Sequence, residues 1–207
     1  MTISSLNNLS VPITGQTPAT SGLLMPKLQF KFRVNFTSFG ASGSDTVELT
    51  RQVMDVTRPS VSFDDVTLNI YNSKVRLAGR HSWEDITLNL RDDTSGIVQK
   101  LVGQQLQKQV DFQEQKTAAA GSNYKFVTKI EILDGGNGNT APVVLETWEL
   151  YGCYLTTANY NALNYATSDP VTIALSIRYD NAVQSEGTKL ESGSTLAVGA
   201  DSAPKTA

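Results

Sequence analysis

The only histidine of the chain, His81, is followed directly by Ser82 and lies three residues before the acidic residue Glu84 and its neighbour Asp85. A base, a nucleophile and a carboxylate that orients the base are the groups that a hydrolase gathers in one cleft. No Gly-x-Ser-x-Gly turn surrounds Ser82 or Ser62, however, and no second histidine offers another base. We therefore expect that the protein is not an enzyme and that His81 faces solvent or another subunit.

The sequence also lacks the residue patterns that bind a metal or a cofactor. The acidic pairs at 64–65 and 84–85 offer carboxylates for a hard cation. Adjacent strand residues point to opposite faces, so neither pair is arranged to chelate with both carboxylates. The glycine-rich run at 135–138 lacks the Lys-Ser/Thr and the helix that a phosphate-binding loop needs. A single cysteine, Cys153, excludes an internal disulfide and a multi-cysteine zinc site. We expect no metal and no cofactor.

The charge balance disfavours tight nucleic-acid binding. The 207 residues include 17 Lys+Arg and 20 Asp+Glu, for a net charge of −3, whereas phosphate binding depends on clustered cations. Lys74, Arg76 and Arg80 form the only notable basic cluster, which suits pairing with acidic side chains of a neighbouring subunit. The N-terminus shows no secretory signal and no apolar run reaches the length of a membrane span, so we expect a soluble protein made inside the cell.

Hydrophobic alternation predicts a mainly β (α+β) fold. Period-two patterns favour strands at residues 28–36, 46–56, 124–133, 143–151 and 171–179. The Asn-Gly and Gly-Gly steps at 134–142 predict a hairpin with a longer loop. Apolar residues spaced by four predict one helix over 97–110, capped by Asp93, Thr94 or Ser95. Most of residues 150–168, a stretch without charge, is expected to be an ordered loop.

Two nine-residue segments resemble each other. Residues 62–70 (SFDDVTLNI) and 82–90 (SWEDITLNL) share five positions, and in both the apolar phase shifts across the acidic pair. Such a shift predicts a bulge or twist at each pair. We interpret the segments as the two strands of a long hairpin-like excursion, joined by a basic connector with a turn near Gly79. Chance similarity between strands of common composition remains the alternative.

The ends of the chain differ from its middle. Residues 1–26 carry no charge, and residues 184–207 are rich in Ser, Gly and Ala; neither stretch can bury a core of its own. The two interpretations are disordered tails or arms held by neighbouring subunits. We predict an N-terminal arm at 1–26, a β domain at 27–183 and a C-terminal arm at 184–207.

Residues 74–88 (KVRLAGRHSWEDITL) resemble the signature of contractile-tail bacteriophage tube proteins, the T-even-like tubes and the related secretion-system tubes. The shared order is a basic strand, a turn glycine, an aromatic residue, acidic residues and a Thr-containing strand before a helix. Residues 144–182 are similar to the closing pattern of that family. Gly79 matches the turn glycine and Trp83 the aromatic residue. The match covers about residues 27–181 with gaps, and the N-terminal stretch, the insertion at 134–142 and the C-terminal tail depart from it.

The resemblance implies a β-sandwich or partial barrel with one helix and extended arms. It further implies hexameric rings, stacked into a tube inside a contractile sheath, with a baseplate and a tail terminator at the ends. Such a tube belongs to a virion assembled in the host cytoplasm and conducts double-stranded DNA. On this interpretation the candidates for subunit contact are Lys74, Arg76, Gly79, Arg80, His81 and Trp83.

A DNA conduit must not grip phosphates, because each cationic contact adds affinity. The lumen is therefore expected to be neutral or acidic, with Asp64, Asp65, Glu84, Asp85, Glu131 and Glu146 as candidates for its lining. Two other classes of function stay open: another β-rich tail, baseplate or secretion-tube component, and a monomeric ligand-binding β-module.

Overall fold

The computed structural model describes residues 26–41, 46–135 and 142–187. The chain divides into two compact units, one of residues 1–33, 131–147 and 185–207 and the other of residues 34–130 and 148–184. Most of the two predicted arms, residues 1–25 and 188–207, lies outside the described residues. The described start of the predicted C-terminal arm continues a strand, because that strand ends only at Glu186.

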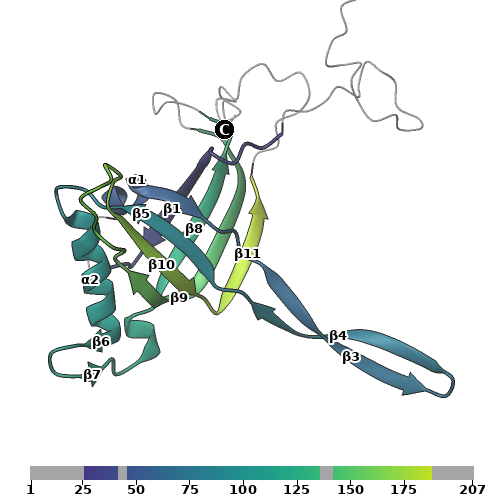
Figure 1. Cartoon of the computed structure of the whole chain (residues 1–207). Coiled ribbons are helices and arrows are strands. Elements are labelled where there is room, and N and C mark those ends of the chain that lie inside the picture. The colour runs from purple at the N-terminus through teal and green to yellow at the C-terminus, as the bar shows by residue number, and fades with distance from the viewer. Residues whose placement is uncertain (1–25, 42–45, 136–141, 188–207) are drawn as a thin grey trace, which may run out of the picture. The chain divides into compact units, whose positions relative to one another are not determined.

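The fold is mainly β, as predicted. Seven strands form one sheet in the order β1-β8-β9-β10-β5-β2, with β11 paired to β9, and β3 pairs only with β4 (Figure 1). The elements are β1 Phe32–Thr37, α1 Val47–Arg51, β2 Val53–Val56, β3 Val61–Ile70, β4 Ser73–Trp83, β5 Ile86–Arg91, α2 Ile97–Gln109, β6 Val110–Asp111, β7 Lys116–Thr117, the 3-10 turn η2 Gly121–Asn123, β8 Phe126–Leu133, β9 Val144–Asn159, β10 Thr172–Arg178 and β11 Asn181–Glu186.

The core of the second unit follows from strict alternation in β5 and β10. These antiparallel strands place Leu88 opposite Leu175 and Leu90 opposite Ile173, and all four side chains are buried. Burial of one such side chain contributes about 1.5–3 kcal/mol. Helix α2 adds Val98, Leu101 and Val102 to the buried set. The strand predicted at 171–179 is therefore confirmed, because β10 differs from that range by one residue at each end.

Glutamine side chains of α2 bind to backbone groups of other segments. Gln105 is fully buried; its Oε1 accepts the Gly40 N–H at 3.1 Å and its Nε2 donates to the Tyr124 carbonyl at 2.6 Å. The Gln109 amide bonds both backbone groups of Leu155, each at 3.0 Å. The two hydrogen bonds of Gln109 resemble those of a neighbouring strand, so α2 takes the place of a strand partner at this point of β9.

Replacing Gln105 by leucine is expected to lower the free energy of unfolding by about 2–4 kcal/mol, because the buried Gly40 N–H and the half-buried Tyr124 carbonyl lose their partner. Urea unfolding measures the change. The matched control is Gln107→Leu on the exposed side of the same helix, where we expect a change within about 0.5 kcal/mol. Equal effects at both positions would contradict the role assigned to Gln105.

Two strand predictions need correction: the strand predicted at 28–36 was too long, and the strand predicted at 46–56 is helical in its first half. Residues 28–31 form a turn in which the Lys31 N–H donates to the Leu28 carbonyl at 3.2 Å, so β1 starts only at Phe32. In the predicted strand 46–56, the first half is the short helix α1, which buries Leu49. The Glu48–Arg51 ion pair spans one turn of that helix, at 2.5 Å, and i,i+3 pairs of this kind favour helix.

The uncharged stretch predicted as a loop at 150–168 is a strand in its first part. β9 continues to Asn159 and pairs with β10, with Thr157 opposite Ser176 and Asn159 opposite Ala174. Lack of charge does not distinguish a loop from a strand, and β-branched threonine favours the strand. The predicted helix bounds were accurate within one residue, but the predicted cap was wrong, because the N-cap is Gly96, at φ +66°, without a side-chain cap hydrogen bond. The Ser95 hydroxyl accepts the Ile97 N–H at 3.4 Å and donates to Asp93 Oδ1.

Candidate assembly interface

Strands β3 and β4 form the predicted excursion, a two-stranded hairpin closed by a turn at Tyr71 and Asn72 (Figure 1). Every residue of β3 is exposed, and in β4 only Gly79 and Trp83 are half-buried. A lone two-stranded hairpin is marginally stable in water, and apolar side chains that stay exposed along it indicate an interaction surface.

The position of the turn corrects one prediction. The basic segment with Lys74, Arg76 and Arg80 is strand β4 itself, and Gly79 lies within it without a positive φ. The second copy of the nine-residue similarity continues into β5 of the large sheet, so the two copies pair with each other only at Ser62 and Ser82. The prediction failed because Ala78, Gly79 and Arg80 were interpreted as a turn, whereas they lie within β4 at a bulge opposite Asp64, with strand pairing on both sides of them.

Gly79 has a steric role at a bulge. The register passes from Phe63 opposite His81 to Asp65 opposite Ala78, so Asp64 alone faces Gly79 and Arg80. A Cβ on Gly79 would lie 3.0 Å from the Asp64 carbonyl oxygen and 3.1 Å from Val66 Cγ2. The bulge predicted at the first acidic pair is therefore confirmed, and a side chain across from Asp64 would make tight contacts that Asp64 or Val66 must shift to relieve. At the second pair the chain leaves β4 and enters β5.

Beyond the bulge the hairpin has one apolar and one polar face. The register places Val66 opposite Leu77 and Leu68 opposite Val75. With Ile70, these side chains form what we call the tip face; all five are 42–55% exposed. The opposite face carries the pairs Asp65–Ala78, Thr67–Arg76 and Asn69–Lys74.

Closer to the sheet the apolar side chains lie on the other face. Phe63 pairs with His81 and Val61 with Trp83, and the His81 ring lies 6.3 Å from the Phe63 ring and 6.1 Å from the Trp83 ring. Strand β3 alternates without interruption, so its residues 61 and 63 face away from its residues 66, 68 and 70. The hairpin therefore exposes apolar side chains on one face near the sheet and on the opposite face near the turn.

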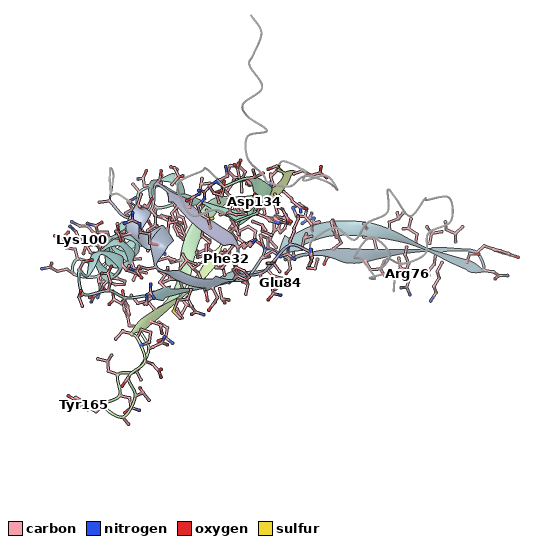
Figure 2. The ribbon with its side chains drawn as sticks, turned by 90° about the horizontal axis from the view of Figure 1, so that it is seen from above. Phe32, Arg76, Glu84, Lys100, Asp134 and Tyr165 are labelled. Atoms are coloured by element: carbon pink, nitrogen blue, oxygen red, sulfur yellow. The ribbon has the colours of Figure 1, made fainter. Side chains whose placement is uncertain are left out.

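The predicted contact residues thus share one hairpin but not one surface. Lys74 and Arg76 lie on the polar face near the turn, and Figure 2 shows Arg76 pointing away from the ribbon. Arg76 has a weak, exposed ion pair with Asp65 at 3.8 Å. The His81 ring lies beside the rings of Phe63 and Trp83. The described residues contain no group of three or more potential metal ligands.

The base of the hairpin is anchored to β10. Asp85 accepts a hydrogen bond from Arg178 Nε at 2.6 Å, and the Trp83 ring lies 5.7 Å from the ring of Tyr179. Among the described residues, neither Trp83 Nε1 nor the buried Tyr179 hydroxyl has a hydrogen-bond partner. Burial, with a smaller contribution from nearby thiol and carboxyl groups, raises the pKa of Tyr179 to about 12.

Tyr179→Phe is expected to leave stability at pH 7 unchanged or to raise it by about 1 kcal/mol, because a buried hydroxyl without a partner is removed. Above pH ~10 the unfolded tyrosine ionises while the folded one keeps its proton, so the wild type loses stability as the pH rises toward the folded value. Urea unfolding between pH ~9 and ~11.5 should show a smaller loss for Tyr179→Phe. The exposed Tyr160→Phe serves as control, and an identical alkaline loss in Tyr179→Phe would contradict the burial argument.

The six candidates for an acidic lining occupy two kinds of environment. Glu131 and Glu146 are 5% and 7% exposed and form ion pairs with Arg33 and Lys27, each at 2.6 Å. Asp64, Asp65 and Glu84 are exposed, and Asp85 is half-buried. That these six residues line a lumen stays a prediction. Asp64, Asp65, Glu84 and Asp85 have the more accessible carboxylates.

One exposed surface was missed from the sequence. The loop at 160–171 joins β9 to β10 and leaves Tyr160, Leu163 and Tyr165 in solvent, Leu163 at 81%. Figure 2 shows Tyr165 on a segment that extends away from the strands of the second unit. The signal was available, because tyrosines among asparagine and serine residues, in a loop with the single charge of Asp169, are typical of binding surfaces.

Comparisons with known proteins support the architecture. No family model and no curated protein matches the sequence. A chain in the cap of the anti-feeding prophage, a tube terminating cap, is 11% identical with a TM-score of 0.57 over 85% of this chain and 99% of that one. A chain in the six-fold symmetrised baseplate of the anti-feeding prophage is 15% identical, with a TM-score of 0.57 over 79% and 98%. A chain in the extended sheath–tube complex of PVC, an extracellular contractile injection system, is 12% identical, with a TM-score of 0.57 over 78% and 92%.

The protein has the contractile-tail tube-like fold. The likeness covers nearly the whole of those chains, so the tube-like fold implied by residues 74–88 is confirmed. In the part of this tube-like chain that the structure describes, no helix has the length and apolar character needed to cross a bilayer.

Proposed function

We propose that the protein is a structural subunit of a contractile tail or injection-system tube, whose copies join into hexameric rings that stack into a tube inside a sheath. The observation that carries the proposal is the β3–β4 hairpin, whose tip face is exposed and whose two strands, among the described residues, pair only with each other. Support also comes from the fold, which is found in a six-fold symmetrised baseplate and a sheath–tube complex. Joining of sheet edges between copies would also cover the free edges of the sheet.

On this proposal the partners are other copies, a surrounding sheath, and baseplate and terminator proteins at the two ends. The tube is part of a virion or similar particle, is assembled in the host cytoplasm, and passes double-stranded DNA without binding it tightly. A net charge of −3 suits such a conduit.

The test is assembly of the purified full-length protein over a range of concentrations, followed by sedimentation velocity and negative-stain microscopy. We expect particles of six times the 22.4 kDa subunit mass and, at higher concentration, tubes. A monomer at every concentration would overturn the proposal.

A second candidate function is a terminator at the end of a tube, because one chain of similar fold belongs to a tube terminating cap. A terminator must stop growth, so it is expected to form single rings that do not elongate. Tubes longer than a few rings in the micrographs would exclude this candidate.

Gly79→Val is expected to reduce tube formation at least about tenfold while the free energy of unfolding changes by less than about 1 kcal/mol. The new side chain would press on Asp64 and Val66 and distort the hairpin, which lies outside the core. Assembly is measured by pelleting and stability by urea unfolding. Ala78→Val, at the neighbouring exposed position, is the control. Parallel loss of both properties in Gly79→Val would show that the bulge serves only folding.

A further inference from the structure

Asp169 and Pro170 form the only Asp-Pro step of the sequence. They lie in the loop between β9 and β10, outside regular secondary structure, and both residues are exposed. Figure 2 shows Tyr165, in the same loop, on a segment that extends away from the strands. The peptide bond between Asp169 and Pro170 is therefore accessible to water.

An aspartate that precedes a proline is able to break the bond between them in acid. A carboxyl oxygen of the aspartate attacks the main-chain carbonyl carbon of the same residue and closes a five-membered cyclic anhydride. The proline nitrogen, which belongs to a tertiary amide, takes up a proton and leaves as a secondary amine. Water then opens the anhydride to two carboxyl groups. The net change is hydrolysis of one peptide bond, which needs no metal and no oxidant.

Strand β10, which follows this bond, is held by strands on both of its sides. It lies between β5 and β9 and pairs with both of them. The side chains of Ile173, Leu175 and Ile177 are at most 1% exposed. Burial of each contributes about 1.5–3 kcal/mol, and a cut in the preceding loop removes none of this packing. We therefore expect β10 to stay in the sheet after the bond is broken.

Hydrogen bonds hold the chain on either side of the bond. Asn161 Nδ2 donates to the carbonyl and hydroxyl oxygens of Thr172 at 3.1 and 2.8 Å. The Val171 carbonyl accepts the Asp92 N–H at 2.9 Å. None of these contacts involves the bond between Asp169 and Pro170, so they persist after its hydrolysis. The new carboxylate and the new amine would form in solvent, where their charges are hydrated.

We propose that the chain cleaves itself between Asp169 and Pro170 in mildly acidic solution, and that the piece starting at Pro170 stays bound to the piece ending at Asp169. Strands β10 and β11 then belong to a separate polypeptide that packing and hydrogen bonds alone retain. Neither the cleavage nor the retention requires that copies of the chain assemble.

The test is a prolonged incubation of the full-length protein at the lowest pH at which its circular dichroism still equals that at pH 7. Mass spectrometry under denaturing conditions is expected to show one piece that ends at Asp169 and another that starts at Pro170. Gel filtration without denaturant is expected to show both pieces together, at the elution volume of the uncut protein. Absence of the two pieces would overturn the cleavage, and their separation on the column would overturn the retention.

Two variants isolate the chemistry. Asp169→Glu keeps the charge but must close a larger ring, and Pro170→Ala keeps the carboxylate beside an ordinary secondary amide. Both positions are exposed, so the fold should be unchanged. Each variant is expected to cleave at least about tenfold more slowly than the wild type, because the attacking and leaving groups are less well matched. Equal rates in all three proteins, or faster cleavage at another bond, would overturn self-cleavage by Asp169.

Discussion

Leu68→Asp is expected to raise the protein concentration needed for assembly about 100-fold and to leave the monomer folded. Leu68 lies in the middle of the tip face, opposite Val75, and is 45% exposed in the single chain. Covering its remaining exposed surface in a contact contributes about 1 kcal/mol, and the aspartate adds the cost of burying a carboxylate. A loss of about 2.8 kcal/mol corresponds to the 100-fold change.

The control is Thr67→Asp, one residue away on the polar face and opposite Arg76. It introduces the same charge where a cation is near, so assembly should change less than about threefold. Sedimentation velocity across a dilution series measures both variants, and circular dichroism with urea unfolding confirms that the monomers are intact. Normal assembly of Leu68→Asp, or equal loss in the two variants, would show that the tip face is not a contact surface.

Gly152→Ala is expected to lower the free energy of unfolding by about 3 kcal/mol and the melting temperature by about 6–12 °C. Gly152 has φ +70°, a conformation that costs an L-residue about 1–2 kcal/mol. Its Cβ would also overlap the carboxylate of Asp180. That carboxylate is held by Lys125 Nζ at 2.5 Å, a pairing that raises the pKa of Lys125, so it cannot move away freely.

Two further variants isolate the cause. Gly103→Ala in helix α2 has open space around the new Cβ and no positive φ, so we expect stabilisation of up to about 1 kcal/mol. Combining Gly152→Ala with Asp180→Ala removes the overlap but keeps the backbone cost, so the double variant should lose less than the sum of the single losses. Additive losses would show that Asp180 is not the obstacle.

The long elements with strict alternation were predictable. β5 and β10 bury every second residue against one core, and the apolar spacing of α2 marks one helical side, so local pattern and tertiary packing agree. Segment α1 was not predictable from its pattern. Its helix depends on the burial of Leu49 and on the hydrogen bond from the Thr46 hydroxyl to the Phe36 carbonyl. Those contacts come from chain segments that a local window does not include.

The hairpin was predicted in the right part of the chain, but its turn was placed incorrectly. The sequence placed Lys74, Arg76 and His81 on one excursion, but it could not reveal which strand they form, because Gly79 is compatible with a turn and with a bulge. Only the register shows that Asp64 faces two residues and that the apolar side chains change face there. The loop with Tyr165 was missed because exposure of an apolar side chain depends on what packs over it.

The bulge has a consequence for how the length of the hairpin can vary. Side chains alternate with period two along a strand. Adding one residue to each strand between the sheet and the tip face would therefore turn the tip face to the opposite side of the hairpin. Adding two residues to each strand would extend the reach by about 7 Å and preserve its orientation. Insertions and deletions compatible with assembly should therefore come in steps of two per strand, except where a one-residue change coincides with gain or loss of the bulge at Gly79 and Arg80.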